Sequence, residues 1–119
     1  MGARPSVTES VVRNHLQAFL AQAGVEAILR DYDDDARFVS ESRTYHGKRE
    51  IGGFFEAFIA SLPPGGIKRF SLRALRVEGE IAYITWSVGS FAPLGTDTFV
   101  VRNGKIVSQT FAMHVAAEA

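Results

Sequence analysis

Apolar residues recur every three or four positions in the first half of the chain, which is the spacing of one helix face. This pattern predicts three helices, with these apolar positions: Val12, Leu16, Phe19 and Ala23 in the first; Val25, Ile28, Leu29 and Tyr32 in the second; Ile51, Phe54, Phe55, Phe58, Ile59 and Leu62 in the third. Ser6 and Glu9 have the spacing of a capping box and predict the start of the first helix, and Gly24 ends it. Two prolines and two glycines at 63–66 end the third helix.

Alternating apolar and polar positions in the second half predict antiparallel strands. We expect strands at residues 67–77, 80–90, 96–102 and 105–115, and a short earlier strand at 36–41. The turn Asn103-Gly104 is a strong hairpin signal because both residues accept positive φ. The polar positions of 67–77 slip in phase between Arg73 and Arg76, which predicts a β-bulge and a bent sheet. Helices followed by strands favour an α+β fold. In such a fold, a curved sheet would wrap around the three helices and form a cone that is open at one end.

The last hairpin can be given a register, because a two-residue turn pairs Arg102 with Lys105. One face then carries Asp97, Phe99, Val101, Ile106, Ser108, Thr110, Ala112 and His114. The other carries Thr96, Thr98, Val100, Val107, Gln109, Phe111 and Met113. Both faces are partly apolar, so the pattern leaves open which one is inside. A sheet with one face in water should alternate more sharply, so either both faces are covered or the second face meets another subunit.

The length of 119 residues predicts one domain, and the composition narrows its partners. The absence of cysteine excludes disulfides, cysteine zinc sites and thiol catalysis. Lys and Arg total 13, as do Asp and Glu, so the positive excess that favours a nucleic-acid partner is missing. No apolar run approaches the ~20 residues of a membrane helix, and the first residues lack a signal-peptide core. We therefore expect a cytoplasmic protein with no nucleic-acid or membrane partner.

Asp97 is the leading candidate for chemistry because it is the only acidic residue between Ile81 and Ala117. Burying a carboxylate in a strand costs several kcal/mol unless the group is protonated or finds a partner. We expect Asp97 inside the cone with a raised pKa, where its neutral form donates a hydrogen bond to a ligand oxygen. The alternative is a strand-start aspartate that faces water.

Other polar residues are weaker candidates. His114 shares the predicted face of Asp97 and would shuttle protons there, unless it lies on a frayed strand end. Glu41 is a candidate base or else a solvated charge. His15 lies on the apolar stripe of the first helix, where we expect a hydrogen-bonded histidine at the edge of the core. The acidic run 33–35 lacks the glycine and glutamate of a calcium loop, so we expect a solvated turn, no metal site and no cofactor.

Three segments resemble segments of NTF2-like proteins, which include ketosteroid isomerases and SnoaL-like polyketide cyclases. They are GVEAILRDYDDDA at 24–36, HGKREI at 46–51 and DTFVVRNGKI at 97–106. The resemblance covers nearly the whole chain. It implies a single NTF2-like domain over residues 1–119 and a cone-shaped α+β barrel. It also implies an apolar pocket between sheet and helices, and a homodimer formed through the outer sheet face.

The residues expected at an isomerase site mostly differ. Leu16 stands where the isomerases have a helix-one tyrosine, and Ser40 stands at the place of their aspartate base. Phe55 replaces a supporting tyrosine, and only Asp97 matches, at the aspartate on the oxyanion side. The resemblance therefore does not extend to standard ketosteroid isomerase activity.

Two hypotheses follow. In the first, the protein binds a small hydrophobic molecule for isomerase, cyclase or hydrolase chemistry, with Asp97 as hydrogen-bond donor or acid and His114 or Glu41 as base. Its expected ligand contacts are Leu16, Phe38, Ser40, Phe55, Phe58 and Phe99. In the second, the protein is a non-catalytic NTF2-like module whose outer sheet face binds a protein, either another copy or a different chain.

Overall fold

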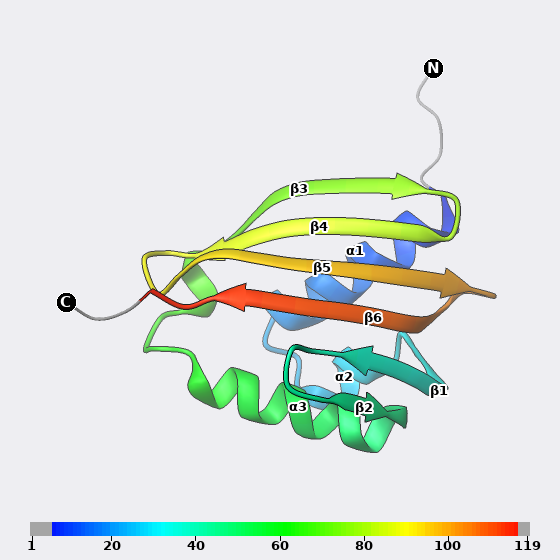
Figure 1. Ribbon diagram of the computed structural model, residues 1–119, viewed down its shortest axis with the longest axis horizontal. Coiled ribbons are helices and arrows are strands. Elements are labelled where there is room, and N and C mark those ends of the chain that lie inside the picture. The colour runs from blue at the N-terminus through cyan, green and yellow to red at the C-terminus, as the bar shows by residue number, and fades with distance from the viewer. Residues whose placement is uncertain (1–5, 117–119) are drawn as a thin grey trace.

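A computed structural model of the protein describes residues 6–116 as three helices and one six-stranded sheet (Figure 1). The expected domain limits, residues 1 and 119, lie outside this range. The helices are α1 (Val7–Leu20), α2 (Val25–Leu29) and α3 (Gly47–Ser61), with a 3₁₀ turn, η1 (Ile67–Arg69). The strands are β1 (Tyr32–Val39), β2 (Thr44–His46), β3 (Phe70–Glu78), β4 (Ile81–Val88), β5 (Ala92–Arg102) and β6 (Lys105–His114).

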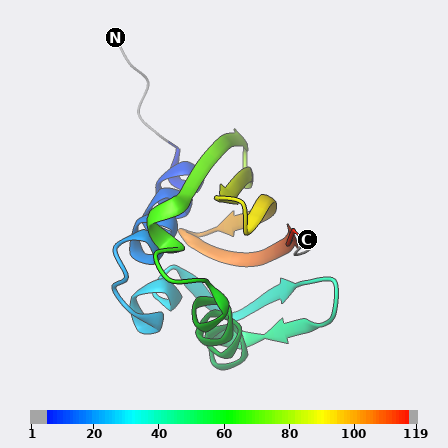
Figure 2. The same ribbon diagram turned by 90° about the vertical axis from the view of Figure 1, so that its left-hand side faces the viewer.

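The sheet is mixed and has the order β2-β1-β6-β5-β4-β3. Only the β1–β6 pair is parallel; the others are antiparallel. The sheet curves around the helices without closing (Figure 2). α1 packs on β4 and β5, whereas α3 packs on β1 and β2. The predicted α+β cone is confirmed, as a sheet with two free edges.

Bulges in β3 and β6 affect which residues face the helices. Arg73 is the extra residue of β3, because Leu72 pairs with Trp86 and Ala74 with Thr85, which confirms the predicted phase slip. The second bulge, in β6, was not predicted. Val101 pairs with Ile106 and Val100 with Ser108, so Val107 is extra. The hairpin register inferred from the sequence is therefore correct at the turn and wrong by one residue beyond Val107.

The start of β1 differs from the sequence prediction. Tyr32 begins this strand and does not end the second helix. Tyr32, Ala36 and Phe38 are all buried, and the pairing with β6 shifts between Tyr32 and Arg37. The acidic run 33–35 lies in this irregular stretch, so it is part of a strand and not the expected turn. The irregularity hides the period of two that would have identified the strand.

The core lies between the concave face of the sheet and the helices. Ser6 caps α1 as predicted, since its Oγ accepts a hydrogen bond of 3.1 Å from the Glu9 amide. The largest fully buried side chains come from both layers: Tyr32, Phe38, Phe99, Ile28, Ile51, Ile84, Ile106, Val12 and Val88. Within residues 6–116, no helix is long and apolar enough to cross a membrane.

Candidate functional site

A cavity of about 40 Å³ lies inside the cone, between α1, α3 and the sheet. Phenylalanine side chains form most of its wall, and its polar contributors are His15, Trp86, Asp97 and Gln109. At ~10–15 Å³ for each water molecule, it has room for roughly three. It is a small, largely aromatic chamber, which we call the inner chamber.

Both carboxylate oxygens of Asp97 accept hydrogen bonds from side chains on neighbouring strands. It is only 6% exposed. Its Oδ1 accepts a hydrogen bond of 2.6 Å from Trp86 Nε1, and its Oδ2 accepts one of 2.7 Å from Gln109 Nε2. The Tyr32 hydroxyl donates to Oε1 of Gln109, which fixes the orientation of this amide. The chain of hydrogen bonds therefore orients the carboxyl at the chamber wall.

Burial raises the pKa of Asp97 to about 6, while the hydrogen bonds from Trp86 and Gln109 act to lower it. The burial effect is larger because the surrounding walls are aromatic and carry no cation. A carboxyl with this pKa reaches both protonation states near neutral pH. It therefore suits general acid or general base chemistry.

A glycine makes room for the Trp86 side chain beside Asp97. Trp86 and Gly95 are paired across β4 and β5. A Cβ at position 95 would lie 2.2 Å from carbons of the indole ring, closer than atoms can approach. Gly95 therefore lets the indole lie against β5 and bring its N–H to Asp97, two residues further along the strand.

His15 also lines the inner chamber and differs from its sequence prediction. It is 4% exposed, and its ring meets the rings of Tyr32, Phe55 and Phe99 edge-on, with centroids 5.4 to 5.7 Å apart. Among residues 6–116, its Nδ1 is the single enclosed side-chain nitrogen or oxygen atom without a hydrogen-bond partner. The prediction that His15 is hydrogen-bonded is therefore wrong. Burial lowers the pKa of His15 to about 4, so the ring is neutral at pH 7.

A second hollow of about 180 Å³, which we call the mouth, adjoins the inner chamber. Its polar wall is Ser40, Glu41 and Ser42 in the β1–β2 turn. Phe54 and Phe111 line both hollows, and their rings lie 5.1 Å apart at an angle of 70°. These two rings therefore form the partition between the inner chamber and the mouth.

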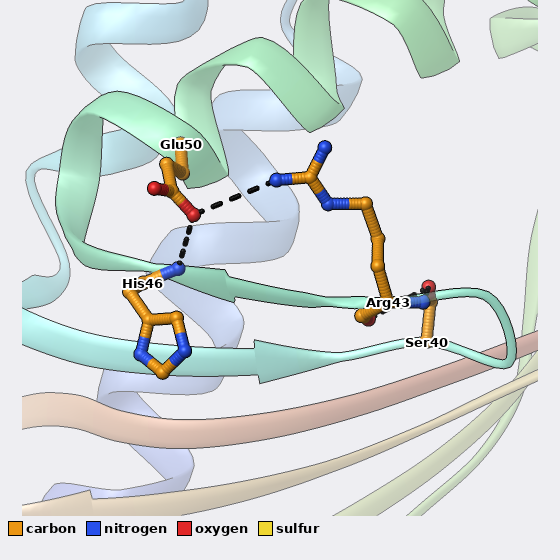
Figure 3. A network of polar contacts seen from close by, with 4 residues as sticks. All are labelled: Ser40, Arg43, His46 and Glu50. Atoms are coloured by element: carbon orange, nitrogen blue, oxygen red, sulfur yellow. Dashed lines mark hydrogen bonds and ion pairs between the residues drawn. The ribbon is translucent and has the colours of Figure 1, made fainter.

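The β1–β2 turn beside the mouth is held by its own polar contacts (Figure 3). The Ser40 hydroxyl accepts from the Arg43 amide at 3.3 Å and donates to the Arg43 carbonyl at 3.1 Å. Arg43 lies 4.4 Å from the centroid of the Tyr45 ring and 3.6 Å from Glu50, which accepts from the His46 amide at 2.9 Å. The Ser40 hydroxyl is therefore engaged in the turn and lies outside the inner chamber.

The structure brings together some of the predicted site residues. Besides Asp97, these predicted contacts line the inner chamber: Leu16, Phe38, Phe55, Phe58 and Phe99. Ser40 and Glu41 lie at the mouth, and Glu41 is exposed. His114 is exposed and pairs with Leu94, on the outer face. The prediction that His114 shares the face of Asp97 is wrong, because the bulge at Val107 puts Phe111 opposite Asp97 instead.

Sequence reasoning missed the polar residues that surround Asp97. Larger and less exposed residues alternate with smaller or more exposed ones in the second half of β6, at Gln109, Phe111 and Met113. This period of two is out of phase with the buried Ile106 at the start of the strand. That slip could have revealed the bulge, as a similar slip did for β3. For His15, no signal in the sequence separates a cavity histidine from a core histidine.

In residues 6–116, no group of three or more His, Asp or Glu side chains is placed to hold a metal ion.

These features define a class of protein: an α+β cone that holds a buried carboxyl group at an apolar inner chamber. Residues 12–109 match the SnoaL-like domain family, and the chain belongs to this family. No curated protein matches the chain in sequence.

Solved structures share the fold over nearly the whole chain. An NTF-2 like protein of unknown function from Burkholderia xenovorans LB400 has a TM-score of 0.76 at 24% identity, over 99% of this chain and 91% of that one. A putative polyketide cyclase from Sinorhizobium meliloti has a TM-score of 0.71 at 18% identity, over 87% and 94%. TerC, co-crystallised with polyporic acid, has a TM-score of 0.71 at 16% identity, over 92% of each. At these identities, the likeness shows the fold alone.

Proposed function

We propose that the protein binds a small apolar molecule through one polar oxygen at the inner chamber, and that Asp97 exchanges a proton with this molecule. The observation that carries the proposal is the buried Asp97 carboxyl on the chamber wall, with a pKa of about 6. Membership of the SnoaL-like family and the likeness to a putative polyketide cyclase support proton-transfer chemistry of the isomerase or cyclase type.

The residues around Asp97 suit such a proton transfer. As a carboxylate, Asp97 would accept a proton from a C–H beside a carbonyl group; as the neutral acid, it would return the proton to another atom. Trp86 and Gln109 hold the carboxyl in place through either state. The aromatic walls lower the local dielectric constant, which strengthens each polar contact with the ligand.

A whole ligand needs more space than the inner chamber offers. A dry cavity that binds benzene measures about 150 Å³, whereas the inner chamber measures about 40 Å³. Movement of Phe54 or Phe111 would join the chamber to the mouth of about 180 Å³. The polar end of the ligand would then lie at Asp97 and its apolar part between the two rings.

Trp86 offers a direct test because it is the only tryptophan and donates to Asp97. Its indole N–H gives one cross-peak in a ¹H–¹⁵N spectrum, which can be followed while phenol or toluene is added. The variants are Asp97→Asn and, as a matched control, Asp35→Asn at an exposed aspartate.

We expect phenol to shift the indole cross-peak in a saturable way and to bind more tightly than toluene. Because hydrogen bonds to charged groups contribute ~1.5–3 kcal/mol, Asp97→Asn should weaken phenol binding by about tenfold or more. Asp35→Asn should bind like the wild type. Equal phenol affinity in Asp97→Asn and wild type, or no saturable shift with either compound, would contradict the proposal.

The second candidate function is a non-catalytic interaction module, favoured by the outer face of the sheet. Ile81 is 49% and Tyr83 41% exposed there, and the small inner chamber holds no large ligand without rearrangement. The expected partner is a second copy of the chain, joined through this face. The phenol titration separates the two functions, because a pure interaction module would bind neither phenol nor toluene in the cone.

A further inference from the structure

His15 is the polar side chain of the inner chamber that receives no hydrogen bond from residues 6–116. It lies on the inner stripe of α1, and its enclosed Nδ1 has no partner within this described range. A buried polar atom left without a partner costs stability, so it calls for an explanation outside packing. The aromatic rings around His15 pack against its ring, and the one hydroxyl among them, on Tyr32, is used by Gln109.

His15 lines the chamber, and only one of its ring nitrogens, Nδ1, is fully enclosed. The other, Nε2, also has no hydrogen-bond partner among residues 6–116, so it is the nitrogen left to meet the chamber. The ring is neutral at pH 7, so it carries one proton. An enclosed N–H without an acceptor is rarer than an enclosed lone pair, which places the proton on Nε2. His15 therefore presents an N–H donor to the chamber.

Asp97 presents the opposite polarity in the same space. Each carboxylate oxygen already accepts one hydrogen bond, but a carboxylate has about four acceptor sites, so it can accept another. The chamber that both side chains line measures only about 40 Å³. Because the shared space is this small, we infer that the same small group of the ligand meets both side chains.

We propose that His15 is a specificity-determining residue: its Nε2–H donates to a carbonyl oxygen of the ligand while Asp97 accepts from an N–H or O–H beside that carbonyl. The group selected is a lactam, another cis-amide or an enolised dicarbonyl. This inference rests on the proposed function, because it assumes that the ligand reaches Asp97. It adds the requirement for a separate carbonyl acceptor next to the donor, whereas in a simple alcohol or phenol a single oxygen would have to serve as both.

Two probes of equal size test this requirement. 2-Pyridone carries an N–H next to a carbonyl oxygen, whereas phenol carries one hydroxyl on a similar ring. Both are titrated into the full chain while the Trp86 indole cross-peak is followed. The variants are His15→Phe, which keeps an aromatic ring without nitrogen, and His15→Gln, which keeps an N–H donor. His114→Phe is the matched control, since this histidine is exposed on the outer face.

The wild type should bind 2-pyridone about five- to tenfold more tightly than phenol, the effect of one added hydrogen bond. His15→Phe should abolish this preference and leave phenol affinity within about twofold, and His15→Gln should restore part of it. The melting temperature of His15→Phe should be unchanged or higher, because the enclosed nitrogen without a partner is removed. His114→Phe should retain the full preference.

Three results would overturn the inference. The first is a wild type that binds both probes equally. The second is a preference that survives in His15→Phe. The third is a lower melting temperature of His15→Phe with equal loss of both probes, which would mean that His15 only supports the fold. Phenol binding without a preference would leave the proposed function standing, whereas failure of both probes in the wild type would contradict the proposed function as well.

Discussion

Replacing Asp97 by asparagine should change how the stability of the fold depends on pH. Burial raises the pKa of Asp97 from its usual 3.8 to about 6 in the folded chain. The folded state binds the carboxyl proton of Asp97 more tightly than the unfolded state does. Protonation of Asp97 therefore stabilises the folded state fully below pH 3.8, and this stabilisation is lost as the pH rises through 6. Each unit between these pKa values corresponds to about 1.4 kcal/mol, so the total loss is about 3 kcal/mol.

The new amide fits the hydrogen bonds around it. Its oxygen can accept from Trp86, and its N–H₂ can donate to Gln109 if the Gln109 amide turns over. The turned amide would donate to the hydroxyl oxygen of Tyr32. The Asp97→Asn variant should therefore fold, and the asparagine side chain is uncharged at every pH.

Urea unfolding of both chains at several pH values measures this effect. Between pH 4.5 and 7.5, the wild type should lose about 2 kcal/mol of unfolding free energy relative to Asp97→Asn. The lowered pKa of His15 acts in the opposite direction, destabilising the fold as the pH falls from 6.5 towards 4, but it does so in both chains. A difference between the chains that stays constant with pH would refute the raised pKa of Asp97.

Further predictions concern the partner residues, the activity and the assembly. Gln109→Leu removes a donor from the Asp97 carboxylate, so the pKa of Asp97 should rise above 6, and the Trp86 cross-peak should titrate at a correspondingly higher pH; an unchanged midpoint would contradict this. Phe111→Ala joins the inner chamber to the mouth and should tighten phenol binding while lowering stability; unchanged affinity would show that Phe111 does not limit entry. The protein should show no appreciable Δ5-3-ketosteroid isomerase activity, because a general base contributes ~10²–10⁴-fold and Ser40 at the base position is held in a turn; robust turnover of a steroid enone would show that another group, such as Glu41, replaces it. Light scattering at tens of micromolar should give twice the chain mass of 13.0 kDa, and Tyr83→Lys on the outer sheet face should shift the mass to a single chain; a wild-type monomer would count against the homodimer.

The fold was predictable from local patterns wherever the spacing of apolar residues was regular. The stripes of α1 and α3 and the turn at Asn103-Gly104 gave elements close to those observed. The prediction failed where the period breaks. The irregular pairing near Tyr32 hid the start of β1, and the bulge at Val107 shifted the far half of β6 by one residue.

The same bulge explains how much of the site was predictable. Asp97 is the only acidic residue between Ile81 and Ala117, which marks it in the sequence as a candidate buried acid, and the structure places it inside the cone. Its partners Gln109 and Trp86 depend on strand register and on the space left by Gly95, which the chain order alone does not reveal. The missing hydrogen bond of His15 depends on what its neighbours lack, so it can be recognised only in three dimensions.

A crystal structure of the full chain with phenol tests the central claim most directly. The account predicts phenol inside the cone, with its oxygen within hydrogen-bond distance of an Asp97 carboxylate oxygen and with Phe54 or Phe111 moved to join the inner chamber to the mouth. Phenol bound only on the outer sheet face, or a cone that stays closed at saturating phenol, would contradict the claim that this cavity is a small-molecule site.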